Sequence, residues 1–242
     1  MDEALYPHLY EIEDQHWWFR GRRAVIWALI SRAELPSSPR LLDAGCGTGR
    51  NLQEFGVLGD PRGVDTSEQA VEFCHQRGLE GVRKAGLEAL PYDDSSFDLL
   101  MACDVIEHVP DDAGALRELR RVAKAGARLL VTVPAYMWLW SYHDDRHHHQ
   151  RRYTRRKLTD LARAAGWAPL LATYFNSVLL PPIAAVRGVQ RRRPEPETTD
   201  YDLTPGWLNE ALTLPMRAEA ELIERGVSLP AGVSIGLVCK PL

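Results

Sequence analysis

The sequence predicts an α/β domain whose sheet is mostly parallel and carries helices on both faces. From residue 40 to residue 175, short apolar segments of strand length alternate with longer segments of helical apolar periodicity. This alternation is typical of β-α-β units, because parallel neighbouring strands need a crossover that is usually a helix. The chain has 242 residues, which suits one large domain with a modest appendage. Its 45% of hydrophobic and 26% of charged residues are ordinary for a globular protein.

Seven segments have the length and apolar character of strands. They are residues 40–43, 62–65, 81–85, 97–102, 128–133, 168–175 and 234–240. Helical periodicity marks residues 16–33, 49–55, 67–77, 112–124 and 154–165. Ser67 is placed to cap the start of its helix, and Gly126 and Gly166 follow the ends of the last two helices. Right-handed crossovers then bring the loops at the carboxyl ends of the parallel strands to one edge of the sheet.

Two parts of the chain lie outside this alternation. Prolines and serines at residues 36–39 separate an N-terminal helical part from the core. Before the last strand, an insertion holds an apolar, proline-broken helix at 178–186, an acidic proline-rich stretch at 194–202 and a helix at 207–225 that we expect to be interrupted at Pro215. We therefore predict three parts, which are a helical lid (1–36), a core (37–175 and 233–242) and a helical cap or insertion (176–232).

Charge and hydropathy exclude several classes of protein. The net charge is −4, so the chain lacks the general basic field of nucleic-acid binders. Its longest apolar stretch, 178–186, is far shorter than the ~20 residues of a membrane-spanning helix. The acidic residues 1–14 do not form a signal peptide, and the four cysteines lack metal-binding spacing, so we expect free thiols and a cytoplasmic protein.

A basic group follows the apolar helix of the insertion and leaves two interpretations open. It consists of Arg187, Arg191, Arg192 and Arg193. An apolar helix with a basic end could rest on an anionic membrane surface. The simpler interpretation, which we favour, is a capping helix whose basic end is solvated.

The most informative segment is Leu-Leu-Asp-Ala-Gly-Cys-Gly-Thr-Gly at residues 41–49. An apolar strand ends in an acid and leads into three alternating glycines that open a helix. Glycines permit a tight turn and the close approach of a ligand to the backbone, and the helix start offers free N–H groups. Asp65 ends the next strand, where a carboxylate can accept hydrogen bonds from ribose hydroxyls. The spacing is GxGxG rather than GxGxxG, which disfavours a nucleotide-dependent oxidoreductase.

With its neighbours, this segment resembles the class I S-adenosylmethionine-dependent methyltransferases. The matching motifs, in chain order, are Asp43–Gly49, Gly63–Ser67, Leu90–Tyr92 with Ser96–Asp98, Asp104–Val109, and Arg152–Thr154 through Ala165–Trp167. The resemblance extends in order over about residues 16–175. It implies a Rossmann-like, seven-stranded, mostly parallel sheet and S-adenosylmethionine as cofactor.

The resemblance also implies which residues surround the cofactor. Around the methionine half and the sulfonium it places Asp43, Gly45, Cys46, Gly47, Gly49, Cys103 and Asp104; around the adenosine half it places Asp65, Thr66 and either Leu87 or Glu88. The adenine contact stays open between the Leu87 backbone, Glu88 and packing alone, because Gly86 occupies a position where such proteins commonly carry an acid that holds the adenine amino group.

Two further segments resemble a bacterial subgroup of these enzymes. In the first, His-Trp-Trp-Phe-Arg at 16–20, the resemblance implies a lid whose aromatic pair shields the cofactor. Phe19 and Arg20 are then cofactor-binding residues, with Arg20 near the cofactor carboxylate. The alternative is a helix that simply covers the sheet.

The second segment, 143–153, follows the fifth strand and is rich in histidine. Its imidazoles can contact the substrate or act as bases, and we single out His147 and His149 together with His108 after the fourth strand. A solvated loop for the segment and a structural role for His108 are the alternatives. His143, His147 and His149 could converge on a metal, but their spacing is not diagnostic and we predict none.

The sequence therefore predicts methyl transfer by in-line displacement to a small-molecule acceptor. A hydroxylated metabolite, a sugar-containing product or a lipid-linked intermediate would fit, with an oxygen acceptor slightly favoured and a partly apolar pocket under the insertion. The alternative from another class is a non-catalytic protein that binds S-adenosylmethionine, because a fold does not guarantee activity.

Overall fold

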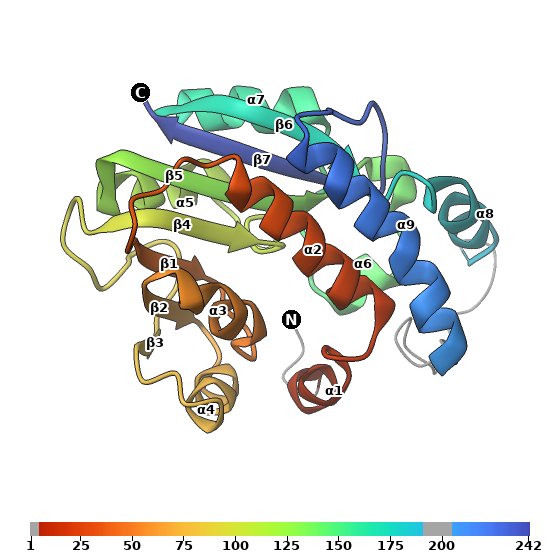
Figure 1. The fold of residues 1–242 in the computed structure, drawn as a ribbon, viewed down its shortest axis with the longest axis horizontal. Helices are drawn as coiled ribbons and strands as arrows, with labels where there is room; N and C mark the ends of the chain where they lie inside the picture. Colours follow the sequence, from red (N-terminus) through yellow and green to blue (C-terminus); the bar gives the residue numbers. More distant parts are fainter. Residues whose placement is uncertain (1–4, 191–204) are drawn as a thin grey trace.

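A single twisted sheet organises the molecule (Figure 1). The computed structural model describes residues 5–190 and 205–242. The seven strands lie in the order β3-β2-β1-β4-β5-β7-β6, and β7 is antiparallel to both of its neighbours. They are β1 (Arg40–Ala44), β2 (Asp60–Asp65), β3 (Val82–Lys84), β4 (Phe97–Cys103), β5 (Ala123–Pro134), β6 (Trp167–Phe175) and β7 (Ser234–Pro241). The predicted Rossmann-like, mostly parallel, seven-stranded sheet is confirmed.

The predicted helices are present, and their ends follow local capping chemistry. The helices are α1 (Leu5–Ile12), α2 (Trp17–Ser31), α3 (Arg50–Phe55), α4 (Glu68–Gln76), α5 (Asp112–Val122), α6 (Tyr142–Arg146), α7 (Arg155–Ala164), α8 (Leu180–Gln190) and α9 (Gly206–Glu224). Ser67 caps α4 by accepting a hydrogen bond from the Ala70 N–H, and Thr154 caps α7 in the same way from Lys157. The short helices α1 and α6 were not predicted.

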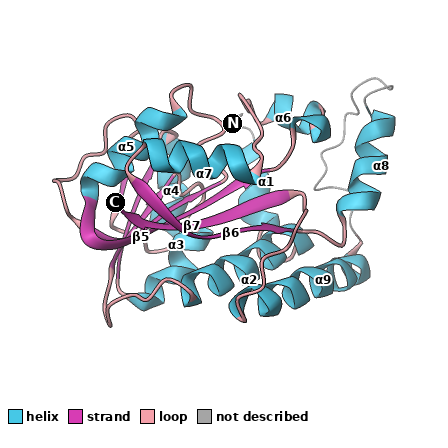
Figure 2. Cartoon of the chain, turned by 90° about the horizontal axis from the view of Figure 1, so that it is seen from above, coloured by secondary structure: helices cyan, strands magenta, loops and turns pink. Residues whose placement is uncertain are grey.

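Different helices cover the two faces of the sheet (Figure 2). On one face, α5 and α7 pack through residues such as Leu116 and Leu158 against the largest apolar cluster, which includes the fully buried Trp167. On the other face, α2 and α9 lie side by side and enclose a second cluster. The core is therefore two apolar layers separated by the sheet, as amphipathic helices on both faces require.

The second helix of the insertion differs from its prediction. We expected an interruption at Pro215, but α9 runs from Gly206 to Glu224 with Pro215 inside it. A proline in a helix interior costs about 3 kcal/mol. Here Met216 and Ile223 are fully buried against α2, which offsets that cost. This half of the insertion is thus part of the core.

The first helix of the insertion, α8, lies at the rim of the carboxyl edge. Glu219 of α9 positions its start by accepting hydrogen bonds from the Ser177 and Val178 N–H groups at 2.8 and 3.0 Å. Arg187 donates to the Leu139 carbonyl and the Ser141 hydroxyl, at 3.0 and 2.7 Å. This residue of the basic group therefore anchors α8 just before the histidine-rich segment 143–153, the histidine loop. The other three arginines and the acidic stretch at 194–202 lie outside the described residues. Across the described helices, none combines the length and the apolar character needed to cross a membrane.

Candidate functional site

The loop between β1 and α3 is shaped by glycines with left-handed backbone conformations. The φ angles of Gly45 and Gly47 are +79° and +54°. A Cβ built on Gly45 would lie 2.5 Å from Val105, whereas one built on Gly47 would have no heavy atom within 4 Å. Gly45 is therefore needed for packing, and Gly47 leaves open space where a ligand can approach the backbone.

Asp65 lies directly beside this loop. Its Oδ2 accepts a hydrogen bond from the Gly47 N–H at 2.8 Å, and its Oδ1 accepts from the Ser67 N–H at 3.0 Å and from the Tyr6 hydroxyl at 3.4 Å. Tyr6 belongs to α1, so that helix covers this carboxylate. Glu13, just after α1, accepts from the Thr48 hydroxyl at 2.7 Å and pairs with Arg77. The N-terminal helix is thus fastened to the glycine loop.

The position of Gly86 is filled by a neighbouring acid. A Cβ built on Gly86 would lie 2.3 Å from Glu88 Oε2 and 3.7 Å from Thr66 Cγ2. Leu87 is buried in the large apolar cluster, whereas Glu88 and Thr66 are exposed. Glu88 therefore brings a carboxylate to the place where the resemblance predicts one.

Two acids stand at the carboxyl ends of β1 and β4. Asp43 is 1% exposed, and its Oδ2 has no hydrogen-bond partner among the described residues. Burial raises the pKa of the Asp43 carboxyl to about 7, although the nearby Arg22 opposes this shift. Asp104 has a φ of +56° and forms an ion pair with Arg22, with 2.5 Å between Oδ2 and Nη1. Arg22 of α2 thus brings positive charge to both acids.

Arg20, which the resemblance placed near the cofactor carboxylate, points elsewhere. It pairs with Glu210 of α9, with 2.5 Å between Nη1 and Oε1, and does not line the cavity at the carboxyl edge of the sheet. Arg22 lines that cavity together with Phe19. Phe19 and Arg22 are three residues apart and so share a helix face, a signal that would have favoured Arg22 over Arg20.

One cavity of about 510 Å³ opens along the carboxyl edge of the sheet. Its walls come from the glycine loop, the loop after β4, the histidine loop, the aromatic start of α2, and α8. Of the predicted site residues, it is lined by Gly45, Cys46, Gly47, Cys103, Asp104, Phe19, His108, His147 and His149. Gly49, Asp43, Asp65, Thr66, Leu87, Glu88 and Arg20 are not in its wall. The adenosine half of the predicted set lies outside the cavity, and α1 reaches it at Asp65 through Tyr6.

The histidine loop is held in place by a buried acid. Asp144 Oδ1 lies 2.8 Å from His149 Nδ1 and 2.7 Å from Arg152 Nε. Although burial opposes it, hydrogen bonds from His149 and Arg152 hold the pKa of Asp144 well below its usual range. The Gln150 N–H donates to the Glu107 carbonyl at 2.8 Å, which joins this loop to the loop after β4. The centroids of the His108 and His149 rings are consequently only 4.7 Å apart.

The comparisons with known proteins point to one family. The sequence pattern of the methyltransferase domain matches residues 42–131. The chain is 34% identical over 110 residues to the uncharacterized methyltransferase YcgJ of Bacillus subtilis, covering 43% of this chain and 44% of that protein. It is 33% identical over 112 residues to the 27-O-demethylrifamycin SV methyltransferase of Amycolatopsis mediterranei, covering 43% of this chain and 41% of that enzyme. Among solved structures, a SAM-dependent methyltransferase of Thermotoga maritima has the same fold, with a TM-score of 0.59, 20% identity and all of both chains covered.

The chain contains a class I S-adenosylmethionine-dependent methyltransferase domain. S-adenosylmethionine is the cofactor of this domain. The chain spans less than half the length of the two sequence relatives, 44% and 41%. The matched part of the methyltransferase domain, 42–131, holds the glycine loop and all of the predicted cofactor residues except Phe19 and Arg20. The histidine loop, α8 and α9 lie outside it.

Several residues of the cavity were not predicted. Tyr6, Glu13 and Arg22 come from the N-terminal part, whose short first helix has no long apolar period. Glu107 lies within the motif at 104–109, but we predicted no separate role for it. Arg152 was likewise predicted only as part of a motif. Burial of such charged side chains depends on tertiary contacts that a local pattern does not contain.

Proposed function

We propose that the whole chain transfers the methyl group of S-adenosylmethionine to a partly apolar acceptor, with an oxygen as the favoured methyl acceptor. The observation that supports this most is the continuity of the cavity. Its wall runs from the glycine loop, through Asp104 and His108, to Leu179 just before α8 and Ile183 on that helix. A cofactor loop and an apolar wall in one cavity suit a reaction between a bound cofactor and a second, less polar molecule.

We assign the methionine half of the cofactor to the end of the cavity at Gly45–Thr48. Arg22 would meet the cofactor carboxylate, and Asp104 and Asp43 would provide negative charge for its amino group and sulfonium. The adenosine half would extend toward Asp65, with Thr66 and Glu88 at the adenine. Because Tyr6 hydrogen-bonds to Asp65 at 3.4 Å, α1 would close over the ribose.

The protein's part in such a displacement is to position the acceptor and to exclude water. His108, His147 and His149 form the polar wall near the acceptor end. Burial, together with His149, lowers the pKa of His108 to about 3, and burial with His143 lowers that of His147 to about 2. Neutral rings of this kind orient an acceptor hydroxyl by hydrogen bonding. They are weak general bases at neutral pH.

The decisive experiment combines calorimetry with a turnover assay. We expect the chain to bind S-adenosylmethionine, and to form S-adenosylhomocysteine when labelled cofactor is incubated with the responsible fraction of a cell extract. Gly47→Val should abolish binding, because its branched side chain enters the ligand's approach, whereas Gly126→Val, where a built Cβ meets nothing within 4 Å, should bind normally. Binding without turnover in any fraction would favour the non-catalytic alternative.

A further inference from the structure

Glu107 carries a buried carboxylate that the fold leaves unsatisfied. The residue is fully buried at the wall of the cavity, and neither of its carboxylate oxygens has a hydrogen-bond partner among the described residues. A buried carboxylate without hydrogen bonds is costly, so such groups are usually paired or coordinate a metal. The arginines that act electrostatically on it, Arg22 and Arg152, are paired with Asp104 and Asp144. A bound cation would satisfy the carboxylate that these pairs leave without a hydrogen bond.

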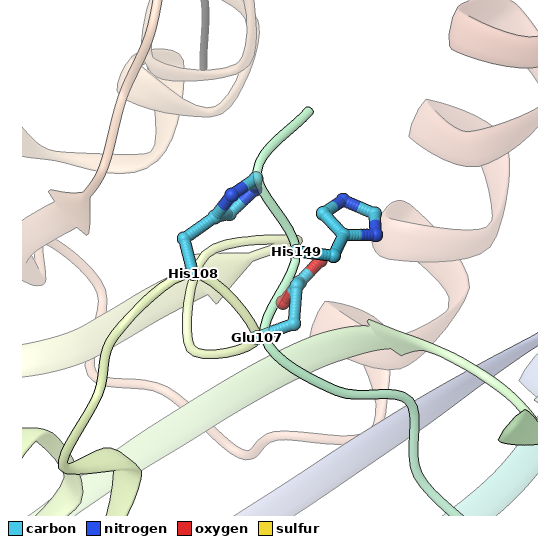
Figure 3. A group of neighbouring side chains, drawn as sticks. All are labelled: Glu107, His108 and His149. Atoms are coloured by element: carbon cyan, nitrogen blue, oxygen red, sulfur yellow. The ribbon is translucent and has the colours of Figure 1, made fainter. Parts of the chain in front are cut away.

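Two imidazoles lie beside this carboxylate, one from the same loop after β4 and one from the histidine loop (Figure 3). One ligand atom each from Glu107, His108 and His149 lies within 4.8 Å of the other two. Ligand atoms at about 2.0–2.2 Å from one ion lie at most about 4.4 Å apart, so small side-chain shifts would bring these three atoms around a single ion. His108 Nδ1 is buried without a partner in the described part of the chain. It is therefore available as a donor to a metal.

The environment of His149 is the arrangement that metal-binding histidines usually have. Its Nδ1 lies 2.8 Å from Asp144 Oδ1, which fixes the ring and leaves Nε2 as the second nitrogen. Asp144 is itself fully buried and held by Arg152 at 2.7 and 2.9 Å. A carboxylate that orients a histidine through its far nitrogen raises the basicity of the ligand atom.

We propose that Glu107, His108 and His149 bind one divalent transition-metal ion. One carboxylate and two imidazoles suit zinc, manganese, iron or cobalt better than magnesium or calcium, which prefer oxygen ligands. From the sequence we predicted no metal, because the spacing of His143, His147 and His149 is not diagnostic. The fold instead joins one of them to two consecutive residues of the loop after β4.

Three protein ligands leave coordination positions open on the cavity side. On the proposed function, such a position would hold the acceptor oxygen and lower the pKa of its hydroxyl. The hydroxyl proton would pass to water as the oxygen forms its bond to the methyl carbon. The bond from that carbon to the sulfonium sulfur would break, with its electron pair left on sulfur. This role rests on the proposed function, whereas metal binding itself does not.

The test is metal binding by the full chain, measured without any turnover. Chelator-treated protein is titrated with Co²⁺, Zn²⁺ and Mn²⁺ by calorimetry, and the visible absorption of the Co²⁺ form reports the ligand set. We expect about one ion per chain. Glu107→Gln and His149→Ala should each weaken binding at least about 10-fold, the lower range for disturbing even the outer ligand shell. His75→Ala, which removes an exposed histidine of α4, should bind as the wild type does.

Equal Co²⁺ affinity and absorption in the wild type, Glu107→Gln and His149→Ala would overturn the proposal. Circular dichroism and thermal unfolding show whether each variant is folded, and His108→Gln provides a third ligand variant if one is not. S-adenosylmethionine affinity of the wild type is measured in parallel. A wild-type chain that binds Co²⁺ at this site but no S-adenosylmethionine would contradict the proposed function and leave the metal site standing.

Discussion

Arg20 and Arg22 are two positions apart in α2, yet they face different surroundings. Arg22 is largely buried between the cavity and Asp104, whereas Arg20 reaches the exposed Glu210 on the neighbouring helix. A charged side chain in a partly desolvated cavity interacts more strongly with a bound ion than one at the surface, where water screens it. This difference makes the two arginines a matched pair for testing where the cofactor carboxylate lies.

Arg22→Ala should weaken S-adenosylmethionine binding by about 10- to 100-fold, the range expected for a lost hydrogen bond to a charged group. Arg20→Ala should change the affinity less than about twofold, because exposed ion pairs contribute little. Calorimetry on both variants checks this. A larger loss in Arg20→Ala than in Arg22→Ala would return the carboxylate to the position that the resemblance implied.

Asp43 should make the stability of the free protein depend on pH. Because its folded-state pKa of about 7 exceeds its ordinary value, the folded state holds a proton that the unfolded state releases between about pH 4 and pH 7. The free energy of unfolding therefore falls as the pH rises through that window, by at most about 1.4 kcal/mol per pH unit for this group. Asp43→Asn cannot titrate and lacks this contribution.

Denaturant unfolding of the wild type and Asp43→Asn at pH 5, 6, 7 and 8 measures the effect. The stability of the wild type relative to the variant should decline from pH 5 to pH 7 and level off by pH 8. A constant difference over pH 5–7 would show that Asp43 is already ionised in the folded protein.

Nearby sequence determines the positions of some site residues, and tertiary contacts between distant segments determine the others. The positions of Gly45 and Gly47 were predictable, because a strand end, a turn and a helix start lie within one short segment, and Asp65 was predictable as the end of the next strand. The burial of Glu107 and the position of Arg22 were not, because both depend on segments far apart in the chain that meet only in the folded protein. The ring of His149 reaches His108 across 41 positions, since the loops after β4 and β5 share one sheet edge.

At the scale of elements, α2 serves two purposes. Its aromatic start and Arg22 line the cavity, while Gly21 and the apolar positions after it pack on α9 and on the sheet. The Trp17 N–H donates to Asn209 Oδ1 at 3.1 Å, which fixes the start of α2 to α9. A substitution that changes this packing should therefore also change the position of the α2 residues that line the cavity.

Gly21→Ala should destabilise the protein by about 1–3 kcal/mol, the usual range for overpacking. A Cβ at this position would lie 2.8 Å from the Met216 Cβ, so the two helices would have to separate. Gly188→Ala in α8 is the control, since its Cβ would meet nothing within 4 Å. Urea unfolding of both variants gives the comparison, and adding Met216→Ala to Gly21→Ala should recover part of the loss. If Gly21→Ala and Gly188→Ala were equally stable, the close contact of α2 with α9 would be wrong.

The elements also show which signals a sequence carries. Long amphipathic helices such as α5 and α7 were predicted to within two residues, because their apolar period and caps agree. The helices α1 and α6 have 8 and 5 residues and were missed, since so few turns give no clear period. At Pro215 the local rule predicted an interruption, and burial of the following turn against α2 overrode it.

At the scale of the whole molecule, the cavity connects two kinds of wall. The wall at the glycine loop lies in the matched methyltransferase domain, and the wall at α8 lies outside it. The sheet topology explains the wall at the glycine loop, because the parallel strands of the domain all end at one edge of the sheet, where their loops meet. The strand pattern does not determine which segments cover that edge, so related proteins can differ in these segments and still keep the cofactor site.

Substitutions at the two ends of the cavity should therefore affect different steps. Ile183 lies in the α8 wall and is partly buried, and a charge there would meet an apolar acceptor. We expect Ile183→Asp to lower turnover about 5- to 150-fold, from a cost of roughly 1–3 kcal/mol for an uncompensated polar group in an apolar contact, while S-adenosylmethionine affinity stays within about twofold. Val189→Asp is the control on the same helix, because Val189 is 51% exposed and does not line the cavity. Calorimetry measures the cofactor affinity and the labelled-cofactor assay measures turnover. A normal rate in Ile183→Asp would show that α8 does not contact the acceptor. An equal loss of turnover in Val189→Asp would show a general effect on the helix.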